Sequence, residues 1–301
     1  MPTWHQVLNH IENFPNPYDH TRRNVLNDIH KHTSSDVVLY ATAWTDPTNP
    51  AHLVSLVDAD LEGFVEVTRT LNGETLNFIL HSPGGSLTVA ENLVDYLRDR
   101  YDYIRVIIPQ AAMSAATMIA LAADEILMAP HATLGPIDPQ FMIPTENGYQ
   151  MVSAEAILKQ FEQAKQECSQ NPNVLAAWMP ILKQYPPGIL IECQNAMALA
   201  KELVEEWLAE YMFHGQPDAE EKAHKIAEFL SSHEDTKVHD RHITRKKAMK
   251  LGLNVQPLER DPDFYEMAMT LYHTVTLTFD QTSVIKIFDN HNGESIVRVK
   301  R

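Results

Sequence analysis

The feature that most constrains the fold is a regular alternation of short apolar segments with longer, helix-like segments between residues 36 and 130. The short segments are rich in β-branched and aromatic residues and therefore predict buried strands. These predicted strands are 36–44, 75–82, 102–109 and 125–130. Because strands that alternate with helices pair in parallel through right-handed crossovers, the order predicts an α/β fold with helices on the faces of a parallel sheet.

Beyond residue 130 the periodicity is mainly helical. Helices are predicted at 154–170, at 189–213 and in the segment AEEKAHKIAEFLSS. The segment ITRKKAMKLGLNVQPLE predicts a short helix that ends at Gly252 and leads into a strand, and the tail from Asp261 combines a helix with a terminal strand at SIVRVKR. We expect one α/β domain at 36–256 with a helical insertion at about 141–185, flanked by an N-terminal helical segment (1–35) and a C-terminal extension (257–301).

Composition narrows the range of partners. A net charge of −16 and a pI near 5.3 argue against a surface for nucleic acid or anionic membranes, which requires clustered Lys and Arg. The two cysteines, Cys168 and Cys193, lack metal-site spacing, and the N-terminus lacks the basic start and apolar core of a signal peptide. The longest apolar run, 111–123, is too short to cross a bilayer. We therefore expect a cytoplasmic protein without a metal or cofactor and without membrane insertion.

Two loops follow the carboxyl ends of neighbouring predicted strands, where open α/β sheets place their sites. In HSPGGSL (81–87), Gly84 and Gly85 permit a tight turn that directs amide N–H groups outward. In PQAAMSAA (109–116), Ser114 enters the first turn of a helix, whose N–H groups favour negative charge. A serine hydroxyl beside backbone donors is what a serine hydrolase requires. The alternative is structural, since a Gly-Gly turn is common and a serine at a helix start is most often a cap.

These same motifs carry a family resemblance. HSPGGSLTVAENLVDYLR, followed by IPQAAMSAATMIALAADEILMAPHATLGPIDPQ, resembles the Clp protease/crotonase superfamily, and most closely the serine dehydrogenase proteinase family, relatives of signal peptide peptidase A. The likeness extends over residues 36–256. It implies a spiral of ββα units with added helices, assembly into homo-oligomers through the helix at 189–213, and peptide or unfolded protein substrates. It further implies that Ser114 is the nucleophile and that Gly85, with Gly84 beside it, and the N–H of Ala115 form the oxyanion hole.

The general base is not evident from the resemblance. Where Clp-type peptidases carry a histidine, this chain has Ile137 and Asp138, and where the signal peptide peptidase relatives carry a lysine the closest match is Gly188. Lys183 lies a few residues upstream and ranks first. A group formed by His239, Asp240 and His242 ranks second, because Asp240 falls where Clp-type peptidases keep their acid and triads are defined by geometry. Lys159 and Lys165 rank third. A lysine base must be desolvated to lower its pKa.

Three functions remain open at this point. The first is a serine peptidase that acts through an acyl-enzyme on Ser114. The second is a non-catalytic oligomeric scaffold or binding protein that keeps the fold but has lost its base; a surface or structural role for His239 and His242 fits this reading. The third, a crotonase-like acyl-thioester enzyme, is disfavoured because no adenine-binding signature is present. His81 and Asp138 are expected beside the two loops, either lining the pocket or hydrogen-bonded at strand ends.

Overall fold

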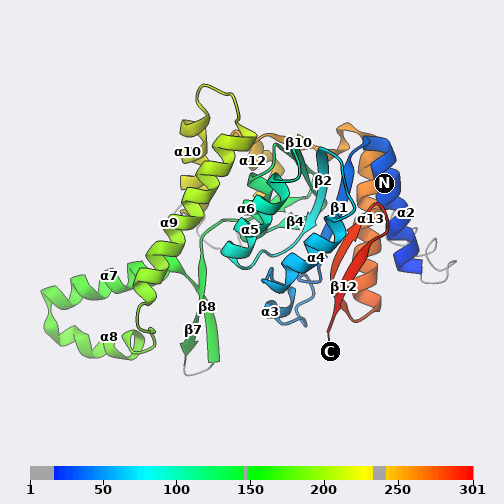
Figure 1. Ribbon diagram of the computed structural model, residues 1–301. Coiled ribbons are helices and arrows are strands. Elements are labelled where there is room, and N and C mark those ends of the chain that lie inside the picture. Colours follow the sequence, from blue (N-terminus) through cyan, green and yellow to red (C-terminus); the bar gives the residue numbers. More distant parts are fainter. Residues whose placement is uncertain (1–16, 146–147, 233–241, 301) are drawn as a thin grey trace.

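The computed structural model describes residues 17–145, 148–232 and 242–300. Within this part of the chain the main sheet has seven strands in the order β10-β5-β3-β2-β1-β11-β12 (Figure 1). Its strands are β1 (Asp36–Thr42), β2 (Thr75–His81), β3 (Tyr103–Ile108), β5 (Glu125–Met128), β10 (Val255–Pro257), β11 (Val284–Asn290) and β12 (Ser295–Val299). The pairs β1–β2, β2–β3, β3–β5 and β5–β10 are parallel, which confirms the predicted α/β fold.

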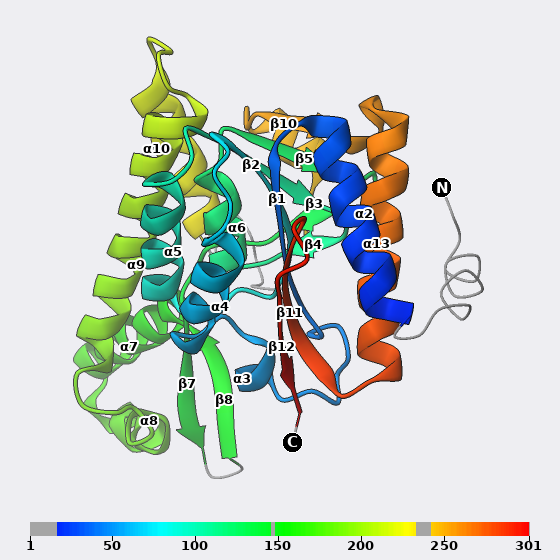
Figure 2. The ribbon, with the colours of Figure 1, turned by 45° about the vertical axis from the view of Figure 1, so that its right-hand side comes forward.

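Helices cover both faces of this sheet (Figure 2). One face carries α4 (Ala59–Thr68), α5 (Leu87–Arg98) and α6 (Ala115–Leu121), and the other carries α2 (Pro17–Thr33) and α13 (Pro262–Gln281). The central strands are buried on both sides, as parallel strands between helix layers must be. Seven consecutive residues of β1 are buried, and this explains why its middle, residues 37–41, is an uninterrupted apolar run rather than an alternating one.

The C-terminal extension completes the sheet. β12 agrees with the predicted terminal strand, whereas β11 was not predicted and pairs antiparallel with β1, with Thr42 opposite Lys286. Side chains alternate between the two faces of a strand, so Lys286 and Phe288 of β11 lie on the same face. That face is covered by α4, because Phe288 packs edge-to-face on Phe64. The last 40 residues therefore belong to the core of the fold and do not form a separate cap.

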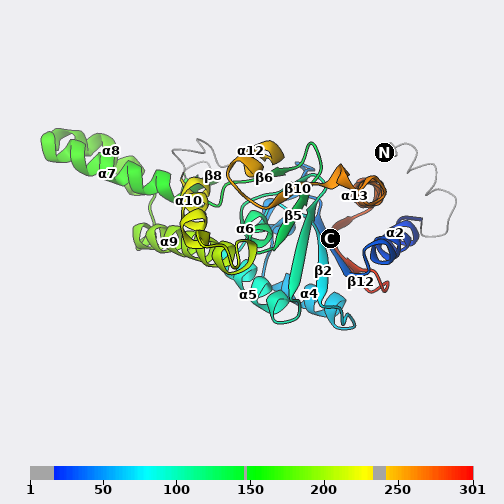
Figure 3. The same ribbon diagram turned by 90° about the horizontal axis from the view of Figure 1, so that it is seen from above.

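A projecting arm follows β6 (Thr133–Leu134). It consists of β7 (Gln140–Thr145), β8 (Gly148–Ser153), α7 (Ala154–Gln170), the turn Pro172–Val174 and α8 (Leu175–Leu182). The expected insertion at 141–185 is thus not purely helical: it begins with an antiparallel hairpin. Exposure alternates along the hairpin: Met142 and Met151 are exposed, whereas Phe141, Ile143 and Val152 pack against the starts of α7 and of α9 (Ile189–Trp207). The segment is apolar on both faces and therefore lacks the apolar–polar alternation that would have identified a strand from the sequence. Figures 1 and 3 show α7 and α8 extending away from the sheet.

The remaining helices pack outside α5 and α6. These are α9 (Ile189–Trp207), which continues as a π-helical turn at Leu208–Met212, and α10 (Ala219–Ser231). Shorter elements complete the fold: α3 (Ala51–Val54), α12 (Arg245–Lys250), the 3-10 turn Leu258–Arg260, and a small sheet that joins β4 (Ala111–Ala112), β6 and β9 (Ile243–Thr244). Gly252 ends α12 at a positive φ of 93°, as predicted. None of the helices in the described residues is long and apolar enough to span a membrane.

Candidate active site

The two loops singled out from the sequence lie side by side at the carboxyl edge of the sheet. They follow β2 and β3, which are adjacent parallel strands. Backbone hydrogen bonds join the loops directly: Ser82 N donates to Ala111 O at 3.3 Å, and Met113 N donates to Ser82 O at 3.0 Å. The two segments therefore form one rigid unit, as expected for loops at the carboxyl edge of a parallel sheet.

Ser114 occupies a strained backbone position at the start of α6. Its φ of 51° and ψ of −123° are unusual for a residue with a side chain, and such conformations cost about 1–3 kcal/mol. The hydroxyl does not cap the helix, and no described residue forms a hydrogen bond with it. The structural alternative of an N-capping serine is therefore excluded by the geometry. The strain places a partly exposed hydroxyl at the junction between strand and helix.

Gly84 and Gly85 have different roles in their turn. A Cβ at Gly84 would lie 2.5 Å from Met113 O and 2.6 Å from Ala115 N, so only glycine permits this approach of the two loops. The Gly84 amide itself donates to Ser82 Oγ at 3.2 Å. In contrast, Gly85 N–H has no acceptor among the described residues. Of the two glycines, Gly85 is the one with an amide free to bind a substrate.

A second free amide belongs to Ala115, the first residue of α6. No described carbonyl accepts a hydrogen bond from it, as is usual for the opening residues of a helix. The helix that carries it is held firmly by Thr117, whose buried hydroxyl donates to Ala112 O at 2.8 Å and accepts from Gly135 N at 2.9 Å. The amides of Gly85 and Ala115, both predicted as oxyanion donors, thus have no partner within the described segments.

Ser114, Gly85 and Ala115 line one cavity of about 350 Å³. Its other walls come from the loop after α3, from the starts of α5 and α6, from β7 and β8, and from α9. These lining residues are Ser55, Pro83, Ser86, Leu87, Met118, Ile137, Pro139, Gln140, Phe141, Met151, Ala196 and Ala200. None of these lining residues, all from the described part of the chain, is acidic or basic. A mostly apolar pocket with a few converging polar groups is the usual form of a binding site.

The candidate bases lie elsewhere. Lys183 follows α8 in the projecting arm, is exposed and does not line the cavity. Lys159 pairs with Glu155 at 2.5 Å, and Lys165 pairs with Glu162 at 3.2 Å. His242 is exposed and contacts Thr133 Oγ1 at 3.1 Å. His239 and Asp240 lie outside the described residues. The assignment of the base stays a prediction.

His81 and Asp138 are both buried at the site's margins. His81 is the last residue of β2, and its ring lies between Trp44 and Tyr272 of α13, with centroid distances of 5.7 and 5.3 Å. It therefore points to the sheet face opposite α6, and it does not line the cavity. Burial lowers the pKa of His81 to about 4, so the ring is neutral near pH 7.

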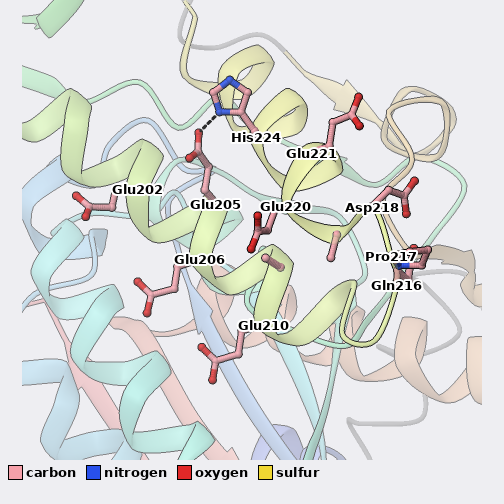
Figure 4. A pocket seen from close by; sticks show the side chains of 12 residues that line it. Glu202, Glu205, Glu206, Glu210, Gln216, Pro217, Asp218, Glu220, Glu221 and His224 are labelled. Carbon is pink, nitrogen blue, oxygen red and sulfur yellow. Dashed lines mark hydrogen bonds and ion pairs between the residues drawn. The ribbon is translucent and has the colours of Figure 1, made fainter.

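A larger hollow lies elsewhere on the described part of the protein. It has a volume of about 1050 Å³ and lies between α9 and α10 (Figure 4). Its acidic lining consists of Glu202, Glu205, Glu206, Glu210, Asp218, Glu220 and Glu221, and His224 bonds Glu205 at 2.9 Å. Ser114 does not line it, and no serine, threonine or cysteine is among the described residues that do.

One group of possible metal ligands occurs in the described residues: His30, Asp36 and His291, whose ligand atoms lie within 4.8 Å of one another. Their hydrogen bonds argue against a metal. His291 Nδ1 accepts from Val37 N at 3.1 Å, so in the neutral ring the proton is on Nε2, the atom that faces Asp36. The two histidine rings stack at 3.8 Å and join α2 to the end of β11. We interpret the group as structural.

Sequence reasoning missed one wall of the site. Ser55 and Leu56, in the loop between α3 and α4, lie against the glycine turn: Leu56 N donates to Gly84 O at 2.7 Å, and Ser86 N donates to Leu56 O at 2.9 Å. A Cβ at Gly85 would lie 2.3 Å from Leu56 O, which accounts for the second glycine. Nothing in the local sequence of residues 55–56 signals this pairing, because the bridge forms across a 29-residue separation.

Fold and site together define a ClpP-like α/β protein in which a serine at a strand–helix junction shares a cavity with two residues whose backbone amides have no acceptor among the described residues. Residues 57–185, which contain both loops, match the family described as ClpP-like SDH-type serine proteinases. The family predicted from the sequence is therefore confirmed over this segment, which carries Ser114, Gly84, Gly85 and Ala115.

Two uncharacterized proteins of Methanocaldococcus jannaschii are similar in sequence. One is 29% identical over 199 residues, covering 65% of this chain and 59% of that protein; the other is 31% identical over 180 residues, covering 60% and 51%. The chain thus spans between half and three fifths of these relatives. Two mutants of the 1510-N membrane-bound stomatin-specific protease, one in complex with a substrate peptide, are structurally similar at 17% identity. The first has a TM-score of 0.39, and the match covers 68% of this chain and 73% of that one. The second, the complex with a substrate peptide, has a TM-score of 0.40, and the match covers 82% of this chain and 81% of that one.

Proposed function

We propose that this protein hydrolyses peptide bonds through an acyl-enzyme formed on Ser114. The observation that carries the proposal is that Ser114, Gly85 and Ala115 line the same cavity and that the amides of Gly85 and Ala115 have no acceptor among the described residues. A substrate carbonyl seated there would receive two hydrogen bonds as its oxygen gains negative charge. Preorganised donors of this kind are worth roughly 3–4 kcal/mol each in transition-state stabilisation.

The reaction proceeds in two steps. The Ser114 oxygen attacks the carbonyl carbon while a general base accepts the hydroxyl proton, and the C–N bond breaks as that proton passes to the leaving amine. Water then attacks the resulting ester, gives a proton to the base, and releases the carboxylic acid and the serine. In both steps the tetrahedral oxygen is held by the amides of Gly85 and Ala115.

The lining of the cavity favours substrates that carry an uncharged, largely apolar side chain next to the cleaved bond. Met118 of α6, Phe141 of β7 and Ala196 and Ala200 of α9 contribute apolar walls, and no lining residue carries a charge. Burying a charged side chain here without a partner would be costly. The small residues of α9 leave room, since Ala196 and Ala200 are one helical turn apart on one side of the helix.

The general base is proposed among the residues identified from the sequence. Lys183 ranks first, followed by the group of His239, Asp240 and His242. Single substitutions Lys183→Met, His239→Gln and His242→Gln distinguish them through the pH dependence of turnover. Removing the true base abolishes the ionisation on the acid side of the profile, whereas the other substitutions leave that ionisation in place.

A fluorophosphonate probe tests the proposed nucleophile. We expect covalent labelling of the wild-type protein and none in Ser114→Ala. Ser86→Ala is the matched control, because Ser86 lines the same cavity but its hydroxyl caps α5 by accepting from Val89 N. Labelling that persists in Ser114→Ala, or that is lost equally in Ser86→Ala, would refute the assignment.

A second candidate function is non-catalytic peptide binding on an oligomeric scaffold. It is supported by the lack of acidic or basic residues among the described residues that line the cavity. Assembly itself is proposed through the arm and the start of α9, where large apolar side chains are exposed: Met142, Tyr149, Met151, Leu175, Met179 and Ile191. Light scattering coupled to gel filtration measures the assembly, and binding of peptides without turnover would favour this second function. The cytoplasmic location expected from the composition remains part of the proposal.

A further inference from the structure

The turn that carries Gly85 is connected to a buried lysine on β11, two strands away from β2 in the sheet. Lys286 of β11 is almost completely buried, and its Nζ donates to Ser55 O at 2.6 Å and to Asp60 Oδ2 at 2.6 Å. Asp60 also accepts from Val57 N at 3.0 Å and from Tyr40 Oη at 3.3 Å. The ammonium group is therefore fixed in position by a satisfied buried network.

Two peptide units connect this lysine to the cavity. Ser55 O, which accepts from Lys286, belongs to the same planar peptide unit as Leu56 N–H. Leu56 N–H donates to Gly84 O at 2.7 Å, and Gly84 O belongs to the same peptide unit as Gly85 N–H. In a trans peptide the C=O and N–H groups point in opposite directions. The Gly85 N–H therefore points away from Leu56, and Gly85 lines the cavity with Ser114.

We propose that Lys286 is a positioning residue that orients and polarises the Gly85 N–H through the Ser55–Leu56 and Gly84–Gly85 peptide units. The two peptide dipoles lie head to tail, with the ammonium at the carbonyl end and the free N–H at the cavity end. Hydrogen bonds in such a chain strengthen one another, and a charged donor at the start is stronger than a neutral one. This inference rests on the proposed function, because the Gly85 amide matters for rate only if it binds an oxyanion.

The location of Lys286 supports this role over a purely structural one. Buried ion pairs contribute little net stability compared with apolar residues of the same size, because desolvation offsets the attraction. Burial of Lys286 lowers its pKa, and the adjacent Asp60 carboxylate opposes this shift. A second buried pair on the same strand, Arg22–Asp289 at 2.7 Å, connects β11 to α2 instead and has no contact with the loop at 55–57. It offers a control of the same chemistry.

The test compares two double variants. Lys286→Met/Asp60→Asn removes the ammonium, leaves no unpaired buried carboxylate, and keeps an acceptor for Val57 N–H. Arg22→Met/Asp289→Asn removes the guanidinium and the buried carboxylate of the control pair, and it also releases Asp19, whose half-exposed carboxylate is solvated. At a temperature where thermal unfolding shows both to be folded, we expect fluorophosphonate labelling of Ser114 to slow by about 10- to 100-fold in the first and by less than about threefold in the second. Equal rates in the two would overturn the proposal.

A second readout does not depend on catalysis. Gly84–Gly85 is the only Gly-Gly pair in the chain, so in protein labelled with glycine containing ¹³C-carbonyl and ¹⁵N, only the Gly85 nitrogen is bonded to a labelled carbonyl. We expect this one amide signal to shift in the Lys286 variant and to stay in place in the control variant. An unchanged Gly85 signal contradicts the inference. A shifted signal in a protein whose wild type is never labelled by the probe supports the connection and instead refutes the proposed hydrolase.

Discussion

Replacing Gly84 by alanine tests whether the close approach of the two loops is required for activity. Gly84 has a φ of 87°, and an added methyl group would lie 2.5 Å from Met113 O and 2.6 Å from Ala115 N. Both contacts are backbone atoms and cannot rotate away. Ordinary contact between such atoms requires about 3.5 Å, so the loops must separate by about 1 Å.

The magnitude of the effect follows from this displacement. A shift of about 1 Å between nucleophile and stabilising groups costs about 100-fold in rate, and complete loss of one oxyanion donor costs about 100- to 1000-fold. Gly85 N–H and Ala115 N–H lie on opposite sides of the forced gap, since Gly84 adjoins one and its methyl group would strike the other. We therefore expect Gly84→Ala to lower the labelling rate of Ser114 by about 100-fold or more.

Gly252→Ala is the matched control for backbone strain. Gly252 has a φ of 93°, and an added Cβ would meet nothing within 4 Å. Both substitutions place alanine in a left-handed conformation, which costs about 1–2 kcal/mol of stability. The assay measures fluorophosphonate labelling rate and thermal unfolding for both variants. If Gly84→Ala labels within a few-fold of Gly252→Ala while remaining folded, the reasoning about the shared cavity is wrong.

Three further outcomes are expected. Ser114→Gly abolishes turnover yet raises the free energy of unfolding by about 1 kcal/mol, because glycine relieves the strain at a φ of 51°; an unfolding free energy below that of Ser114→Ala would contradict this. Acid destabilises the protein through His81: the unfolded ring binds a proton below its ordinary pKa of 6.5, whereas the folded ring binds one only near its lowered pKa of about 4. The stability present above pH 6.5 is thus lost as the pH falls toward 4, by roughly 3 kcal/mol in total, and the pH dependence of urea unfolding should flatten in His81→Gln. Ala196→Phe fills part of the cavity and should slow cleavage of peptides with large apolar residues more than that of alanine-containing peptides, whereas Ile191→Phe, on an exposed part of α9, should affect both equally.

Local sequence patterns were sufficient for the parallel part of the fold. Apolar composition and period predict strands β1, β2, β3 and β5 and the helices between them. A strand buried on both faces is a short apolar run, whereas an amphipathic helix repeats its apolar residues every three or four positions, so a few residues of sequence distinguish the two. The same patterns located the two loops, since connections at the carboxyl ends of adjacent parallel strands must meet. The sequence alone therefore led to Ser114 and to the glycine turn.

Other features depend on contacts between distant parts of the chain. The strained backbone of Ser114 and the bridge between Leu56 and Gly85 exist only when three loops pack together. His81 looked like a residue of the site, but the alternation of side chains along β2 sends it to the opposite face. A shift of one residue in strand register would turn this side chain to the other face of the sheet. Register is fixed by pairing with the neighbouring strands rather than by local propensity.

The sequence by itself determined a parallel α/β sheet with a serine and two glycines at one edge. Only the tertiary structure decided which amides lack an acceptor among the described residues and that the described lining of the cavity carries no charge. It also decided that Lys286 of an unpredicted strand bonds Ser55, 231 residues away along the chain, in the loop that pairs with the glycine turn. The physical reason is the distance along the chain over which each feature is determined. Periodicity within a segment shows which of its faces is buried, whereas the partner of an individual hydrogen-bonding group is a residue that only the folded chain brings close.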